Sequence, residues 1–67
     1  MADGKYRFEV AGKIALVDVY TADGNRFFDL FVEGERTPLN KEAPVFEGET
    51  EDQLLSRIRR TLNSGSR

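Results

Sequence analysis

The pair of residues in this chain that most resembles a catalytic or metal-binding site consists of two aspartates, Asp18 and Asp29. A tight hairpin turn at the Asp-Gly pair 23–24 would place their carboxylates opposite each other on neighbouring strands. Two such carboxylates can share a proton or hold a hard cation. Arg7 is expected in the same row, and like charges that face each other in a sheet need a counter-charge. We therefore favour a charge-balanced surface trio over an active site or a metal site.

The composition removes most other kinds of catalytic site. The chain of 67 residues contains no Cys and no His, so it lacks thiol nucleophiles, imidazole bases and the usual zinc ligand sets. The six glycines are scattered at turns and form no phosphate-binding or nucleotide-binding motif. We expect a protein that is not an enzyme and that uses no cofactor and no metal.

Length predicts a single small domain over residues 1–67, with loose termini at residues 1–4 and 64–67. The N-terminal segment contains no apolar run long enough for a signal peptide or a membrane-spanning helix, so the cytoplasm is the expected location. A core of this size usually gains support from disulfides, a metal or a partner subunit. Because Cys and His are absent, this argument favours self-association.

Hydrophobic patterning predicts three strands joined in an antiparallel meander. Residues 5–11 alternate as in a half-buried strand, and residues 14–21 are apolar on both faces, as expected of a central strand. The stretch RFFDLFVEGE, residues 26–35, begins with the third strand. Two-residue turns at Gly12-Lys13 and at 23–24 would connect the three.

This register gathers nine apolar side chains on one face of the sheet. Its rows place Tyr6 opposite Val19 and Arg7 opposite Asp18. We expect this face to be the core, and its members are Tyr6, Phe8, Val10, Ala15, Val17, Val19, Phe28, Leu30 and Val32.

The second face of the sheet also carries apolar side chains, beside Arg7. They are Leu16, Tyr20, Phe27 and Phe31. A sheet needs only one buried face to fold, so this second cluster raises the question of what covers it. Three alternatives are open: residues 36–49 fold back over it with Leu39, Val45 and Phe46, two copies pack face to face in a homodimer, or a different protein binds there.

The C-terminal third predicts a loop followed by an amphipathic helix. Residues 40–49 resemble a loop, with a short fourth strand at residues 44–47 as the alternative. Thr50 and Gln53 have the spacing of a capping box, which predicts that Thr50 is the N-cap. Asn63 and Gly65 are expected to end the helix. Its apolar stripe consists of Leu54, Leu55, Ile58 and Leu62, and its arginines, expected toward the negative end of the helix dipole, are Arg57, Arg59 and Arg60.

The sequence thus predicts an α+β fold: a small antiparallel meander of three strands, with an optional fourth, packed on one C-terminal amphipathic helix. Many unrelated small domains share this layout, so it indicates no particular family. The expected function is that of a small non-enzymatic cytoplasmic protein which acts through protein–protein contacts and self-associates through the aromatic face. Membrane association and a small-molecule substrate are not indicated.

Nucleic-acid binding is the alternative function. The C-terminal arginines could contact phosphates, and Tyr20, Phe27 and Phe31 could stack on single-stranded bases. The charged positions of the aromatic face oppose this, because two cationic side chains stand against four acidic ones: Lys5 and Arg7 against Glu9, Asp18, Asp29 and Glu33.

Overall fold

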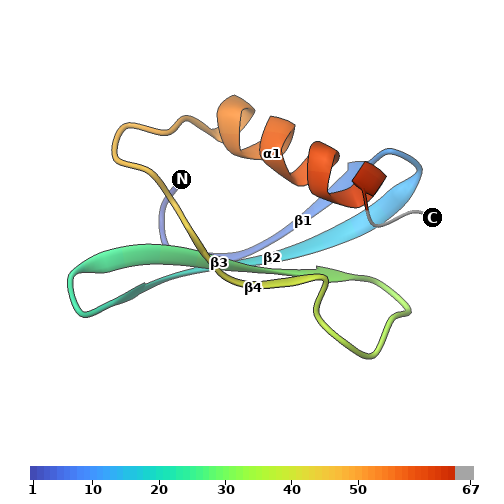
Figure 1. Cartoon of the computed structure of the whole chain (residues 1–67), viewed down its shortest axis with the longest axis horizontal. Coiled ribbons are helices and arrows are strands. Elements are labelled where there is room, and N and C mark those ends of the chain that lie inside the picture. Colours follow the sequence, from blue (N-terminus) through green and yellow to red (C-terminus); the bar gives the residue numbers. More distant parts are fainter. Residues whose placement is uncertain (65–67) are drawn as a thin grey trace.

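A computed structural model describes residues 1–64 and contains one antiparallel sheet with one helix on one of its faces (Figure 1). The sheet order follows the chain order, β1-β2-β3-β4. The predicted α+β meander on a C-terminal helix is confirmed, and the sheet has four strands. The elements are β1 (Gly4–Val10), β2 (Lys13–Ala22), β3 (Asn25–Val32), β4 (Asn40–Pro44) and α1 (Glu51–Ser64).

The hairpin between β2 and β3 has the predicted turn and the predicted register. Asp23 and Gly24 both have positive φ, 53° and 79°, as the two central residues of a type I′ turn require. The strands therefore pair with Asp18 directly opposite Asp29. The Asp-Gly pair alone was sufficient to predict this part of the sheet.

The hairpin between β1 and β2 turns one residue earlier than predicted. Its central residues are Ala11 and Gly12, with φ of 53° and 77°, while Lys13 is the first residue of β2 and lies opposite Val10. Glycine thus occupies the second central position, as it does at the Asp-Gly turn. The predicted turn at Gly12-Lys13 would have placed glycine first, whereas type I′ turns favour glycine at the second central position.

This correction moves β1 by two residues relative to β2. Tyr6 lies opposite Val17 rather than Val19, and Arg7 lies opposite Leu16 rather than Asp18. Because side chains alternate with a period of two, a shift of two residues leaves each of them on its predicted face. The predicted rows were wrong across this hairpin, but the predicted core face was right.

The fourth strand lies at residues 40–44 and not at residues 44–47. Ala43 pairs with Phe28 and Asn40 with Leu30, so β4 contains a bulge between these two pairs. Glu42, in the bulge, has a φ of 54°. The segment is polar and lacks strand alternation, which is why it was predicted to be a loop.

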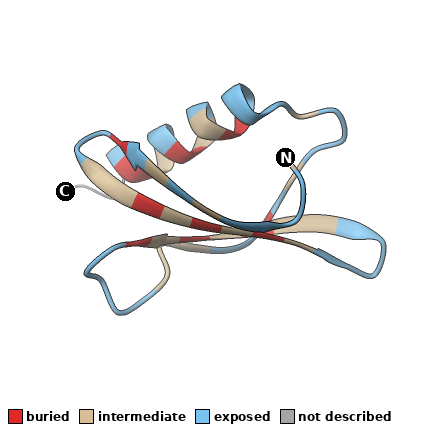
Figure 2. Cartoon of the chain, turned by 180° about the vertical axis from the view of Figure 1, so that it is seen from behind, coloured by how far each residue is buried: buried red, intermediate tan, exposed pale blue. Residues whose placement is uncertain are grey.

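The core fills the space between α1 and the sheet face toward it, as Figure 2 shows by the buried segments on both. Seven of the nine residues predicted for this face are buried, and Tyr6 and Phe8 are half-buried against the same core. Leu55 of the predicted helix stripe is also half-buried. The helix and β4 supply the remaining buried residues: Leu54, Ile58 and Leu62 from α1 and Ala43 from β4.

The predicted capping box begins the helix. The backbone N–H of Gln53 donates to the Thr50 hydroxyl at 3.2 Å, and the N–H of Thr50 donates to the Gln53 side-chain oxygen at 2.9 Å. Ser64 is the last helical residue described. The rest of the expected C-terminal tail, including the expected helix end at Gly65, lies outside the described residues.

The residues that precede and begin β1 make specific contacts. The Asp3 carboxylate accepts hydrogen bonds from the Thr21 hydroxyl at 2.7 Å and from Arg26 Nε at 3.3 Å. The guanidinium of Arg26 also donates to the Met1 carbonyl. These bonds hold residues 1–3 beside the hairpin of β2 and β3. Among the described residues, no strand pairs with the outer edge of β1.

Candidate interaction surface

The sheet face that points away from α1, called the open face below, carries all five residues predicted for the candidate site. They are Arg7 on β1, Leu16 and Tyr20 on β2, and Phe27 and Phe31 on β3. Side chains alternate along each strand, so the residues between the core positions form this face. The apolar side chains among the five are half-buried, and none of them belongs to the core cluster.

The apolar residues among these five form two clusters. In one row, Leu16 lies between Arg7 and Phe31. Two rows away, the rings of Tyr20 and Phe27 are 5.9 Å apart between centroids, at an interplanar angle of 35°. The row between the two clusters is charged, because it contains Asp18 and Asp29.

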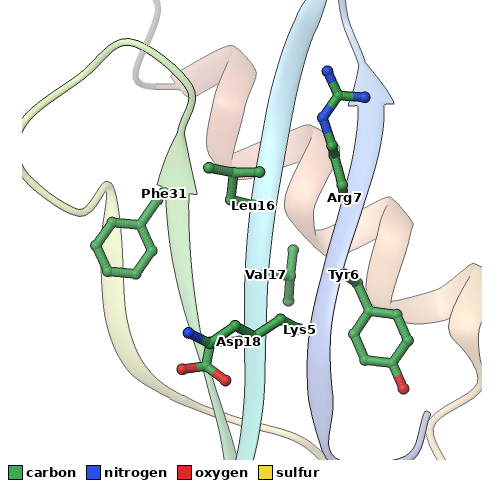
Figure 3. Close-up of a pocket in the computed structure, with 7 residues that line it drawn as sticks. All are labelled: Lys5, Tyr6, Arg7, Leu16, Val17, Asp18 and Phe31. Carbon is green, nitrogen blue, oxygen red and sulfur yellow. The ribbon is translucent and has the colours of Figure 1, made fainter.

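A shallow groove of about 440 Å³ runs along β1 and β2 at the first of these clusters. Figure 3 views it from the side opposite α1, with the helix behind the sheet. Cationic, acidic and apolar groups all line it, so a partner there would meet both charges and an apolar floor. The lining residues are Lys5, Tyr6, Arg7, Leu16, Val17, Asp18 and Phe31.

The predicted row of Arg7, Asp18 and Asp29 does not form, because of the shifted hairpin. Lys5 takes the place of Arg7 opposite Asp18. Arg7 instead has its Nε 3.8 Å from Glu33 Oε2, in an exposed ion pair. The charge-balanced character of the row is therefore retained with a different cation.

Asp29 has a structural role that the sequence did not indicate. One of its oxygens, Oδ1, accepts a hydrogen bond from the Tyr20 hydroxyl at 3.1 Å and another from the backbone N–H of Glu42 at 2.9 Å. The Glu42 residue is the positive-φ residue of the β4 bulge. The carboxylate therefore attaches the edge strand to the sheet.

The same contact changes the acidity of Tyr20. Burial of its hydroxyl raises the pKa of Tyr20 above the ordinary value, and the hydrogen bond to Asp29 adds to the increase. The negative charges of Asp29, Glu42 and Asp18 raise this pKa further. The phenol is therefore held in its neutral, donating form on the open face.

The residues expected to cover the open face lie elsewhere. Leu39 and Val45 pack against the core, and Phe46 is 58% exposed. The Phe46 ring centroid lies 4.5 Å from the guanidinium carbon of Arg57, a helix residue. The first of the three alternatives, cover of the open face by these loop residues, is therefore not what the structure shows.

Arg57 is a further residue whose role differs from the predicted one. Its Nη1 donates to both carboxylate oxygens of Glu49, at 2.7 and 2.9 Å, and to the Pro44 carbonyl at 2.9 Å. The guanidinium also lies 5.4 Å from the Phe28 ring centroid. Arg57 thus ties α1 to the segment after β4. The predicted complementation of the helix dipole does not describe this residue.

Residues 1–64 contain no group of three or more His, Cys, Asp or Glu side chains arranged to hold a metal ion. Within the same described range, no helix is both long enough and apolar enough to cross a bilayer. No protein-family model, curated protein or solved structure matches the chain.

Proposed function

We propose that this chain is a small, non-enzymatic cytoplasmic protein that acts through protein–protein contacts and self-associates through its open face. The observation that carries the proposal is the position of Leu16 and Phe31. They lie side by side on the face away from α1, outside the core, while the apolar residues of the loop and β4 pack on the helix side.

A second copy suits this face because the face carries charges of both signs around its apolar centre. When two such sheets stack about a two-fold axis, the cluster of Leu16 and Phe31 meets the same cluster of the second copy. Lys5 and Arg7 can then approach Asp18 of the partner subunit, so the charges need no third component. Burial of apolar surface stabilises such a contact by about 25 cal/mol per Å².

The non-enzymatic part of the proposal is supported by the hydrogen bonds of Asp29. The carboxylate pair of Asp18 and Asp29 was the only catalytic arrangement that the sequence offered. Asp29 already accepts two hydrogen bonds from groups that hold β4 and Tyr20. With no Cys, the chain also needs no oxidising compartment for its fold, which suits the cytoplasm.

Nucleic-acid binding receives less support from the same contacts. Arg57 is bound to Glu49, and Arg7 lies beside Glu33, so two of the candidate phosphate ligands already have acidic partners. Titration of labelled single-stranded and duplex DNA at low salt separates the two functions. Our proposal expects no saturable binding, whereas binding that weakens steeply with added salt would favour the alternative.

The proposal is tested by Phe31→Lys, measured by sedimentation across a wide range of protein concentration. A cation at the centre of the open face should halve the mass of the assembly and leave the circular dichroism spectrum unchanged. Phe46→Lys is the matched control, because Phe46 is an exposed phenylalanine on the other side of the sheet, and its assembly should keep the wild-type mass. An unchanged mass for Phe31→Lys would contradict the proposal.

A further inference from the structure

The two edges of the sheet differ in how they are protected. At one edge β4 is only five residues long, contains the bulge at Glu42 and ends at Pro44. Short length, bulges and proline are features that prevent an edge strand from pairing with another chain. At the other edge β1 pairs with β2 over seven consecutive residues without a bulge or a proline. Of the two edges, β1 therefore offers the longer and more regular strand to another chain.

The backbone groups at this edge can be assigned from the hairpin. The two-residue turn makes Val10 and Lys13 a hydrogen-bonded pair, and hydrogen-bonded residues alternate along an antiparallel strand. Lys5, Arg7 and Glu9 consequently direct their N–H and C=O groups away from β2. Because β1 is the outermost strand, no strand of residues 1–64 pairs with these groups.

We propose that β1 pairs antiparallel with β1 of a second copy about a two-fold axis at Arg7. This register places Lys5 opposite Glu9 of the partner subunit, and Glu9 opposite the partner's Lys5. Opposite charges on directly opposed positions stabilise a strand pair. Neither Lys5 nor Glu9 has an ion-pair partner within 4.0 Å among residues 1–64. Near the axis Arg7 faces its counterpart, and each has Glu33 beside it as a counter-charge.

The aromatic residues of β1 support the same register from the opposite face of the strand. Tyr6 and Phe8 stack with centroids 6.0 Å apart and an interplanar angle of 6°, and both remain only half-buried at the margin of the core. The Tyr6 ring extends past the outer side of β1 in Figure 3. A pair centred on Arg7 sets Tyr6 opposite Phe8 of the partner subunit. It thereby covers both rings and extends the core across the junction.

This contact is made by the outer edge of β1 rather than by the apolar centre of the open face, and it does not rest on the proposed function, although Lys5 and Arg7 are available to both contacts. Pairing at the edge joins two four-stranded sheets into one sheet of eight strands, with both open faces on the same side. The two-fold axis of the edge contact is perpendicular to the sheet, whereas that of a face-to-face contact is parallel to it. The two contacts together close into a tetramer with D2 symmetry.

A charge exchange between Lys5 and Glu9 tests the edge contact. Lys5→Glu creates two Glu–Glu oppositions per pair and should halve the mass measured by sedimentation. The double variant Lys5→Glu/Glu9→Lys restores opposite charges and should restore the wild-type mass. Lys41→Glu reverses an exposed lysine on the blocked β4 edge and should keep the wild-type mass. Hydrogen exchange gives a second readout: the outward amides of Lys5, Arg7 and Glu9 should be protected in the wild type and lose protection in Lys5→Glu.

The edge and face contacts fail in distinguishable ways. Wild-type mass for Lys5→Glu, or a double variant that fails to regain it, would overturn the edge pairing whatever Phe31→Lys does. If Lys5→Glu halves the mass and Phe31→Lys does not change it, the edge contact stands alone. Rapid exchange of the outward β1 amides in the concentrated wild type would also overturn the edge pairing.

Discussion

Asp29 accepts a hydrogen bond from the backbone N–H of Glu42 at a distance of 2.9 Å. Asp29 lies in β3, and Glu42 lies in the bulge of β4, where its φ is 54°. The Asp29 carboxylate, rather than a backbone carbonyl of β3, therefore accepts the Glu42 N–H at the point where the bulge shifts the pairing of β3 and β4. The carboxylate that most resembled a catalytic group in the sequence instead positions the edge strand.

We predict that Asp29→Ala destabilises the fold by about 1–2 kcal/mol, because it leaves the Glu42 amide and the Tyr20 hydroxyl without their acceptor. Urea unfolding measures the loss, and exchange of the Glu42 amide should accelerate. Asp18→Ala is the matched control, since Asp18 opposes Asp29 but has no side-chain hydrogen bond in the described residues. Its effect should stay within about 0.5 kcal/mol. Equal losses for the two variants would contradict the assigned role.

The raised pKa of Tyr20 predicts a pH dependence at the alkaline end. Because the folded state holds the phenolic proton more tightly, its contribution to stability is fully present below the ordinary value of about 10. It is lost as the pH rises through the folded pKa. Ultraviolet titration of Tyr6→Phe in dilute solution should show Tyr20 ionising above that value.

Adding Asp29→Asn to this background removes a charged acceptor and should lower the Tyr20 pKa. Glu47→Gln changes an exposed acidic residue that is not among the charges that raise the pKa of Tyr20, so it should leave the Tyr20 titration where it was. A Tyr20 pKa that does not respond to Asp29→Asn would show that the hydrogen bond between them does not persist in solution.

Arg57→Leu should destabilise the fold by about 2 kcal/mol, because it leaves the Glu49 side chain, which is 5% exposed, without its cation. Arg57→Lys should recover only part of this loss, since a lysine cannot bridge the carboxylate, the Pro44 carbonyl and the aromatic rings with one planar group. Arg60→Leu, an exposed change one turn further along α1, should cost less than about 0.5 kcal/mol. Chemical denaturation compares the three, and similar losses for Arg57→Leu and Arg60→Leu would exclude the bridge.

Much of the fold could be predicted from local sequence signals. The Asp-Gly pair at 23–24 determined the pairing of β2 with β3, and alternation identified the core face. Thr50 and Gln53 marked the start of α1. Each of these signals involves residues close together in the sequence, so it can be recognised without knowing how the rest of the chain folds.

The features that escaped prediction depend on contacts between distant segments. The polar segment of β4 becomes a strand because Asp29, 13 residues earlier, supplies an acceptor to its bulge. Arg57 turns toward Glu49 and Pro44 because packing of α1 brings these segments together. The turn at Ala11-Gly12 is a different case. It could have been predicted from the sequence, because type I′ turns favour glycine at the second central position.

The predicted interaction residues lie on the face that was predicted for them, but the predicted neighbours of Arg7 were wrong. Leu16, Tyr20, Phe27 and Phe31 depend only on the β2–β3 hairpin, whose register was right. Arg7 depends on the β1–β2 hairpin, and its true neighbours are Leu16 and Glu33. Whether loop residues cover this face could not be predicted, because Leu39, Val45 and Phe46 can each reach more than one surface.

The most direct test of the open-face contact is an isotope-filtered nuclear Overhauser experiment on a mixture of labelled and unlabelled chains at high concentration. Self-association through the open face predicts cross-peaks between the Phe31 ring of one chain and the Leu16 methyl groups of another. The Phe46 ring, on the helix side, should give no such peaks between chains. If the sample shows only intramolecular contacts for Phe31 and the relaxation of a monomer at that concentration, the open face is not an association surface.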